Sequence, residues 1–205
     1  MSLLLHETRT NPSLQFAVWT IEESEEALEL LCGIKAPSHL KTPTRRLEYL
    51  AVRTLAVKLG INPASIVYKP TGQPYLQGDS RTISITHTKG HAALLLSDQP
   101  GTGIDMEARS ERVLRVKHKY MHPEEEALLL TVNMDETTGL LLHWCVKEAV
   151  FKAIPEEGID FKQDIRVNIG SKTATYVPTG KLFTLETWCT AAYALVVCYP
   201  SDQIR

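Results

Sequence analysis

Residues 103–107 read Gly103-Ile104-Asp105-Met106-Glu107, and the rest of the chain is organised around this stretch. It follows an apolar run at 92–96 and a break at Pro100-Gly101, which predicts that it forms a strand. Residues two apart on a strand point to the same face, so the carboxylates of Asp105 and Glu107 are placed side by side. Adjacent carboxylates repel each other unless a proton or a cation lies between them. A hard, oxygen-preferring ion such as Mg²⁺ meets that requirement.

A second stretch, at residues 144–152, has helical spacing and reads Trp144-Cys145-Val146-Lys147-Glu148-Ala149-Val150-Phe151-Lys152. Trp144, Glu148 and Lys152 lie four apart and therefore share one helix face. That face adds a third carboxylate and a cation, a combination that indicates the handling of a phosphate ester or anhydride. The alternative is a plain strand end together with a surface ion pair between Glu148 and Lys152, which would contribute little stability.

Length and composition narrow the class of protein. The chain has 205 residues, enough to bury a core either as one domain or as two small lobes. The 22 basic residues nearly balance the 24 acidic ones, so the overall charge does not indicate a nucleic-acid binder. No apolar run approaches the roughly 20 residues of a membrane span, and the run at 3–5 is too short for a signal peptide. The four cysteines lack a C-x-x-C spacing, which favours neither zinc nor a disulfide framework. We expect a reduced, cytoplasmic monomer without a nucleic-acid or membrane partner.

The pattern along the chain predicts an α+β protein. Helices are expected at about 22–32, 42–59 and 138–154, and a shorter one begins at Pro123. Strands are expected at 16–19, 66–68, 82–87 and 92–97, and the part after Pro155 is rich in β structure (166–169, 173–177, 182–188, 191–198). Each half of the chain therefore runs from helix to antiparallel strands, which favours two lobes.

Positively charged residues gather in three places. Arg45, Arg46 and Arg53 lie on the predicted helix at 42–59, where they form either a solvated face or an anion site. His87 ends a strand beside hydroxyl groups, as a phosphate contact or as an ordinary surface residue. Residues 109–119 either dock an acidic partner or form a solvated face; their charged members are Arg109, Arg112, Arg115, Lys117 and Lys119 against Glu111.

The order of these motifs resembles that of the 4′-phosphopantetheinyl transferases, specifically the larger Sfp type. The resemblance covers about residues 45–155 and rests on Arg45-Arg46, Gly72-Gln73-Pro74-Tyr75, Ser84-Ile85-Thr86-His87, Gly103-Ile104-Asp105-Met106-Glu107 and Trp144-x-x-Lys147-Glu148-Ala149-x-x-Lys152. It implies a pseudo-twofold α+β fold, in which each lobe is a small antiparallel sheet packed with a long helix. We expect an N-terminal lobe at 1–100 on the nucleotide side, a C-terminal lobe at 101–205 with the metal site, and an active site between them.

The resemblance also implies an activity. Such enzymes transfer 4′-phosphopantetheine from coenzyme A to a serine of an apo acyl or peptidyl carrier protein, release 3′,5′-ADP and require Mg²⁺, as in fatty acid or secondary metabolite biosynthesis. The residues of this sequence that match the metal ligands are Asp105, Glu107 and Glu148, with Glu148 and Lys152 as the catalytic pair. Those that match coenzyme A contacts are Arg45 or Arg46 for the nucleotide end and His87, Lys147 and Lys152 for the phosphates. An acidic carrier protein would dock near 109–119.

Two departures from the family pattern are visible. Gln73 stands where the family has a lysine, so Lys69 or Lys89 would have to supply that cation. Residues 120–123 replace the family's Phe-Ser pattern, which leaves Glu125 without an assigned role. Two rival functions use the same residues: a Mg²⁺-dependent nucleotide or coenzyme A hydrolase, and a coenzyme A-binding module without catalysis.

Overall fold

The computed structural model describes residues 2–10 and 13–201, and the chain divides into two compact units, Met1–Pro100 and Gly101–Arg205. Each unit contains an antiparallel sheet packed with helices, which confirms the predicted α+β class. None of the helices in the described ranges has the length and apolar character needed to cross a bilayer.

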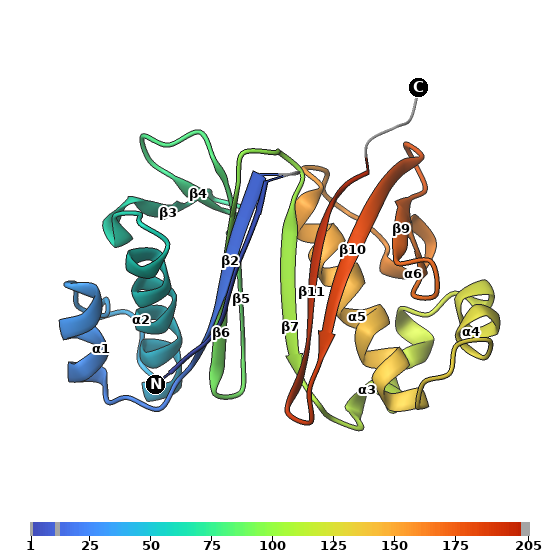
Figure 1. The fold of residues 1–205 in the computed structure, drawn as a ribbon, viewed down its shortest axis with the longest axis horizontal. Helices are drawn as coiled ribbons and strands as arrows, with labels where there is room; N and C mark the ends of the chain where they lie inside the picture. Colours follow the sequence, from blue (N-terminus) through green and yellow to red (C-terminus); the bar gives the residue numbers. More distant parts are fainter. Residues whose placement is uncertain (1, 11–12, 202–205) are drawn as a thin grey trace. The chain divides into compact units, whose positions relative to one another are not determined.

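The N-terminal unit is built on a four-stranded sheet in the order β1-β2-β6-β5 (Figure 1). Helix α2 packs against β6 and β2 of this sheet, and α1 packs on α2. A separate two-stranded sheet pairs β3 with β4. The bounds are β1 Leu3–Thr10, β2 Ser13–Thr20, α1 Glu25–Cys32, α2 Pro43–Lys58, η1 Pro63–Ser65, β3 Ile66–Tyr68, β4 Pro74–Leu76, β5 Thr82–Thr88 and β6 His91–Ser97.

Local sequence signals explain where these helices begin and end. Thr42 accepts a hydrogen bond from the backbone N–H of Arg45, and Pro43 takes the first helical position of α2. Helix α1 ends at Gly33, whose φ of 72° is a left-handed conformation that favours glycine. Both ends agree with the sequence prediction. The buried face of α2, with Leu50 and Leu55 fully inaccessible, holds the helix on the sheet.

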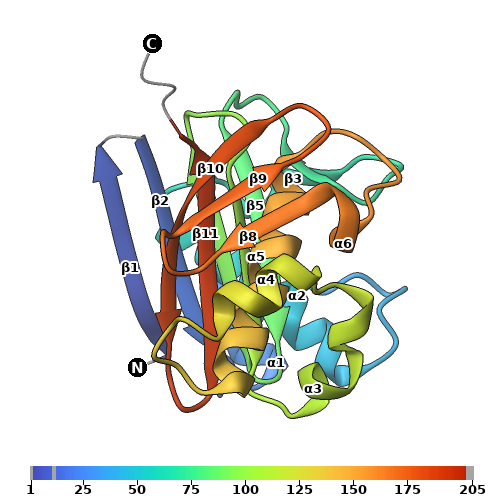
Figure 2. The same ribbon diagram turned by 90° about the vertical axis from the view of Figure 1, so that its right-hand side faces the viewer.

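The C-terminal unit is built on a five-stranded sheet in the order β7-β11-β10-β9-β8 (Figures 1 and 2). The long helix α5 packs against β7 and β11, α3 packs on α5, and α4 and α6 pack on β8. The bounds are β7 Gly103–Ala108, α3 Arg112–Val116, η2 Lys117–Lys119, α4 Pro123–Leu129, α5 Glu136–Ala153, α6 Phe161–Asp164, β8 Ile165–Asn168, β9 Thr173–Tyr176, β10 Lys181–Cys189 and β11 Tyr193–Pro200.

Helix α5 positions the residues of the second motif. Asp135 caps its N-terminus by accepting from the backbone N–H of Thr138, so the helix begins slightly earlier than the sequence predicts. It ends at Ala153, two residues before Pro155, as expected for a residue preceding a proline. Most of its length is buried, because the sheet covers one side and α3 and β8 contact others.

Candidate active site

Strand β7 carries the two carboxylates that the sequence places side by side. In the antiparallel register with β11, Asp105 is opposite Val196 and Glu107 is opposite Ala194. Both side chains leave β7 on the same face, since they lie two residues apart. Asp105 is only 5 % exposed, whereas Glu107 is half-buried. A carboxylate as buried as Asp105 requires a cation or hydrogen-bond donors beside it.

Helix α5 supplies that cation. Lys152 Nζ donates to Asp105 Oδ1 at 2.6 Å and to the carbonyl oxygen of Ile104 at 3.2 Å. The simple alternative drawn from the sequence was a surface pair between Lys152 and Glu148, one turn away on the same helix. The ammonium group lies on β7 instead, so the helix face that carries Lys152 is turned toward the carboxylate strand.

The close approach of α5 to β7 depends on Gly103. A Cβ atom at this position would lie 2.0 Å from the carbonyl oxygen of Ala149 and 3.3 Å from Sγ of Cys198. The first distance is far shorter than a van der Waals contact, so any side chain would push the helix away from the strand. Ala149 directly follows Glu148, and this contact therefore determines how closely Glu148 approaches β7.

The carboxylates of the two motifs interact electrostatically. The pKa of Glu148 is raised to about 7, chiefly by burial and also by the charges of Asp105 and Glu107, while Lys152 opposes the increase. Such mutual effects require charged groups that lie close together in a poorly solvated place. The structure therefore brings Asp105, Glu107, Glu148 and Lys152 close together, and their role as a metal and catalytic site stays a prediction.

The chemistry of these donors fits a hard divalent cation, because Mg²⁺ prefers carboxylate oxygens. Across residues 2–10 and 13–201, no group of three or more His, Cys, Asp or Glu side chains is already arranged to hold a metal ion. At Asp105 the positive charge comes from Lys152. The carboxylate oxygens thus suit Mg²⁺ in kind, whereas the described conformation does not arrange three of them around one point.

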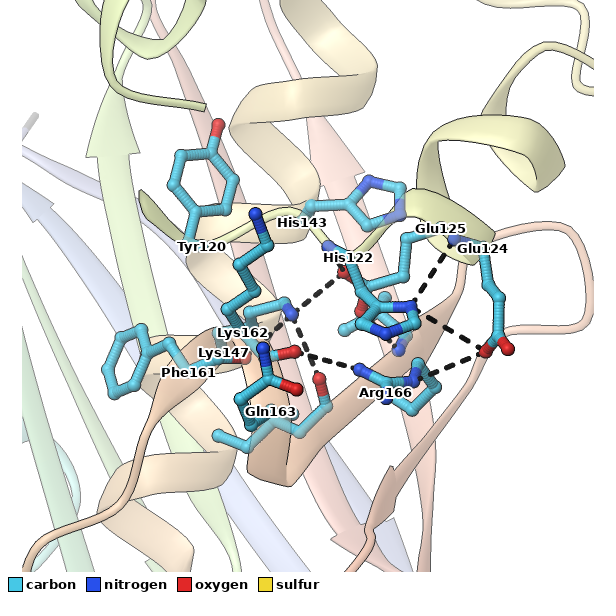
Figure 3. Close-up of polar contacts among 12 residues, drawn as sticks. Tyr120, His122, Glu124, Glu125, His143, Lys147, Phe161, Lys162, Gln163 and Arg166 are labelled. Carbon is cyan, nitrogen blue, oxygen red and sulfur yellow. Dashed lines mark hydrogen bonds and ion pairs between the residues drawn. The ribbon is translucent and has the colours of Figure 1, made fainter. Parts of the chain in front are cut away.

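The resemblance assigns Lys147 to the coenzyme A phosphates, but the ammonium group of Lys147 does not contact Asp105 as that of Lys152 does. The Lys147 side chain is fully buried and its Nζ donates to Glu125 Oε2 at 2.8 Å (Figure 3). The same ammonium group donates to the carbonyl oxygens of Phe161 and Ile165 at 2.7 and 2.9 Å. Burial lowers the pKa of Lys147, and the Glu125 carboxylate opposes that shift. An ammonium group has three N–H donors, and all three have acceptors inside the C-terminal unit.

Glu125, to which the sequence assigned no role, is the partner that fixes Lys147. It is completely buried and forms a capping box with His122 at the start of α4. The sequence signal for this capping role is an acid three residues into a helix that begins with proline. The ion pair with Lys147 has no such signal, because the two residues are 22 positions apart.

The N-terminal unit brings two of the predicted anion-binding residues together. Arg45 Nη1 lies 3.3 Å from His87 Nε2 and 3.2 Å from Glu48 Oε2. His87 Nδ1 lies 3.5 Å from the same Glu48 oxygen. The side chain of Arg45 is 61 % exposed, so this pair is accessible to a ligand. Arg45 and His87 come from α2 and β5, and only the fold makes them neighbours.

Arg46, which the resemblance offers as an alternative to Arg45, forms contacts that hold parts of the N-terminal unit together. Its guanidinium group pairs with Glu25 of α1, with Nε 2.8 Å from Oε2, and also donates to the carbonyl oxygens of Pro37 and Leu40. These contacts connect α1 and the following loop to α2. Arg45 is therefore the better candidate of the two for a ligand contact.

Arg53 is buried and belongs to no solvated face. Its Nη2 donates to the carbonyl oxygen of Ile66 at 3.2 Å, and its guanidinium carbon lies 4.3 Å from the ring centroid of Tyr49 and 5.9 Å from that of Tyr68. Its Nε and Nη1 have no hydrogen-bond acceptor among the described residues. Both nitrogens are buried, so an external anion has no access to them, and the guanidinium group lies against the Tyr49 and Tyr68 rings. Burial therefore argues against the solvated face for Arg53 and leaves anion binding a prediction.

The turn that lacks the family's lysine still carries an ammonium group. Lys69 Nζ donates to Gln73 Oε1 at 2.8 Å across the loop between β3 and β4. Gln73 therefore holds Lys69 at the position in the chain where the departure occurs. Of the two candidate cations, Lys69 has a contact with this turn, and its role in replacing the missing lysine stays a prediction.

The basic stretch at 109–119 divides into two kinds of residue. Arg109 pairs with Asp135 and Lys117 with Glu136, each at 2.8 Å, so both contact the start of α5. Arg112 and Arg115 of α3, and Lys119 after it, are exposed to solvent. Any docking of an acidic partner would therefore depend chiefly on these three residues.

The C-terminal unit is similar in sequence to a known protein family. Residues 101–198 match the family model described as the 4′-phosphopantetheinyl transferase superfamily. This match includes β7 and α5 with their carboxylates and Lys152. Residues 101–198, slightly less than half of the chain, are therefore similar to the 4′-phosphopantetheinyl transferase superfamily, which implies transferase chemistry. No curated protein matches the chain at a significant level.

Proposed function

We propose that this protein transfers 4′-phosphopantetheine from coenzyme A to a serine of an apo acyl or peptidyl carrier protein, releasing 3′,5′-ADP in a Mg²⁺-dependent reaction. The observation that carries the proposal is the environment of Glu148, a carboxylate of raised pKa that interacts with Asp105, Glu107 and Lys152. Glu148 lies in the region that matches the superfamily model, which indicates that the reaction is a phosphopantetheinyl transfer. The two-unit chain, of which the family model matches only the second unit, supports the larger Sfp type.

In this proposal Asp105, Glu107 and Glu148 would hold Mg²⁺. When bound, the ion would neutralise charge on the pyrophosphate of coenzyme A and so favour attack on phosphorus. Lys152 lies on Asp105 Oδ1, where it can stabilise phosphate oxygens that approach the same place. This chain thus contributes three carboxylates as metal ligands and one ammonium group, that of Lys152, beside them.

The chemical step is a phosphoryl transfer. The serine Oγ of the carrier protein forms a bond to the β-phosphorus, the bond from that phosphorus to the bridging oxygen breaks, and 3′,5′-ADP leaves. The serine proton would go to Glu148, which acts as the general base. Without a metal, burial and the neighbouring carboxylates raise the pKa of Glu148 to about 7, and a bound cation would lower it again, so that the carboxylate is ionised and able to accept the proton near neutral pH.

The N-terminal unit supplies cations for the nucleotide end of coenzyme A. Arg45 and His87 form one accessible pair. A phosphate group suits this pair, because an arginine can donate two parallel hydrogen bonds to it. Lys69, held by Gln73, adds a further positive charge.

In this proposal the carrier protein docks on the exposed arginines of α3. Carrier proteins are usually acidic, and Arg112 and Arg115 are the solvent-exposed charges of this helix. Opposite charges raise the rate of encounter and orient the partner.

The deciding experiment incubates the protein with coenzyme A, Mg²⁺ and an apo carrier protein and weighs the carrier by mass spectrometry. The expected result is a carrier mass increased by one phosphopantetheine and an equal amount of 3′,5′-ADP. Chelation of the metal, or Lys152→Ala, should suppress both products. Release of 3′,5′-ADP with an unmodified carrier would indicate the hydrolase, and coenzyme A binding without any product would indicate the binding module. Either result would contradict the proposal.

A further inference from the structure

Three elements meet at the buried ammonium group of Lys147. Its hydrogen bonds reach Glu125 on α4, Phe161 at the start of α6 and Ile165 at the start of β8 (Figure 3). Since Lys147 lies on α5, these bonds fasten one side of that helix to three neighbours. No donor of the ammonium group remains for a ligand.

Glu125 is held as firmly as Lys147. Its Oε2 also accepts from the backbone N–H of His122 at 2.7 Å, and its Oε1 accepts from the backbone N–H of Val167 at 2.7 Å. The carboxylate therefore closes the first turn of α4 and binds β8 directly. A buried carboxylate with this many donors has a single favourable position, so it is a fixed anchor for Lys147.

Aromatic contacts strengthen the same side of α5. The ring of Phe161 lies 5.8 Å from Trp144 and 5.5 Å from Phe151, measured between centroids. Trp144 and Phe151 precede and follow Lys147 by about one helical turn, so they share its face. Phe161 thus contacts α5 through its ring and through its carbonyl oxygen.

The opposite constraint on α5 comes from β7. The carbonyl oxygen of Ala149 lies so near Gly103 that no Cβ atom would fit there. Lys147 and Ala149 are the two residues that flank Glu148. Glu148 is therefore the residue of α5 whose position is fixed from both sides, by a polar anchor and by a close backbone contact.

We propose that the buried pair of Glu125 and Lys147 positions Glu148 against Asp105 and Glu107, and that neither member of the pair binds coenzyme A. The proposal rests on the proposed function of the same site. Glu125 and Lys147 are positioning residues: they act through the rotation and height of α5 and touch no substrate. A displacement of about 1 Å can cost a catalyst about a hundredfold in rate, so a firm anchor beside Glu148 has a direct consequence for transfer.

The test compares Lys147→Met with the double variant Glu125→Gln/Lys147→Met. The single variant leaves a buried carboxylate without its cation and should lower Tm, whereas the double variant removes both charges and should recover much of that loss. Both variants lack the bonds to Phe161 and Ile165, so both should lose roughly a hundredfold in kcat. The Kd for coenzyme A, measured by calorimetry, should stay at the wild-type value.

A matched control separates positioning from general destabilisation. Leu185→Ala removes a buried side chain of β10 that is 2 % exposed and lies in the core of the same unit. It should lower Tm comparably to Lys147→Met and keep kcat near the wild-type value. A further readout is Mn²⁺ affinity by electron paramagnetic resonance, which should weaken in the double variant and not in Leu185→Ala.

The outcomes are distinct. A raised Kd for coenzyme A with unchanged kcat would make Lys147 a ligand and overturn the proposal. If kcat and Tm both recover in the double variant, the pair only stabilises the fold. That result would also overturn the proposal. If the single variant does not fold, the kcat and the Kd for coenzyme A of the double variant decide between the outcomes. If the wild-type protein transfers nothing, the proposed function fails, and Mn²⁺ affinity still tests whether the pair positions Glu148.

Discussion

Replacing Glu148 with glutamine should stabilise the metal-free protein at alkaline pH while it removes transfer. Burial and the neighbouring carboxylates raise the pKa of Glu148 from 4.5 to about 7 in the folded protein. A group with a raised folded pKa favours the folded state fully below its unfolded pKa, and that contribution is lost as the pH rises through the folded pKa. The ionised Glu148 therefore costs stability above pH 7, and glutamine, a neutral mimic of the protonated acid, avoids this cost.

The size of the effect follows from the two pKa values. Each tenfold change in proton affinity corresponds to about 1.4 kcal/mol, so the difference between 4.5 and about 7 corresponds to about 3 kcal/mol at alkaline pH. Glu148 keeps some contact with solvent, which screens part of the repulsion, and we expect about 2 kcal/mol. For a chain of this length, about 2 kcal/mol raises Tm by about 4–8 °C.

The assay is differential scanning calorimetry of wild-type protein and Glu148→Gln with a chelator present. The variant should melt higher at pH 8.5, and the gain should shrink as the pH falls from about 7 through 4.5, because well below 4.5 the wild-type carboxyl group is protonated in both states. Glu126→Gln, which changes an exposed acid of α4, is the matched control and should show no such pH dependence. Added Mg²⁺ should raise Tm of the wild-type protein and not of Glu148→Gln, and kcat should fall at least about a hundredfold. A variant that melts at or below the wild-type temperature at pH 8.5 would refute the reasoning, because the carboxylates would then not destabilise one another.

Three further predictions follow from the site. Asp105→Ala should abolish Mg²⁺-dependent transfer and leave the circular dichroism spectrum unchanged; full activity at low Mg²⁺ would remove Asp105 from the site. Gly103→Ala should displace α5, because its Cβ atom would lie 2.0 Å from the carbonyl oxygen of Ala149, and should lower kcat more than Gly170→Ala, whose Cβ atom would meet nothing closer than 3.4 Å. Equal kinetics for the two glycine variants would show that α5 tolerates the displacement. Arg112→Glu/Arg115→Glu should raise KM for the carrier protein and not for coenzyme A, with an effect that fades as salt screens charges over about 8–10 Å. The control Lys35→Glu/Lys41→Glu makes the same charge change on exposed residues of the N-terminal unit, and equal effects of the two double variants would argue against docking on α3.

Local patterns in the sequence were sufficient for the long helices, for most strands and for the placing of Asp105 and Glu107 on one face. The Thr42-Pro43 cap, the left-handed Gly33 and the proline after α5 marked helix ends because each acts within a few residues of itself. Asp105 and Glu107 could be placed on one face because the alternation of a strand depends on nothing outside it. Glu148 could be joined to them by the order of two motifs in the chain.

Long-range packing decided which cations belong to the site. Lys147 and Lys152 lie on the same helix, and no periodicity distinguishes a lysine that meets Asp105 from one that meets Glu125, because those acids come from other elements. Arg45, Arg46 and Arg53 share α2 in the same way, yet one is exposed beside His87, one pairs with Glu25 and one is buried beside Tyr49. A helix fixes the angle between its side chains at about 100° per residue, but the partner that each side chain meets depends on the elements packed around the helix. The sequence therefore determined which residues carry charge, and only the tertiary structure determined which of those charges hold the fold and which lie at the surface.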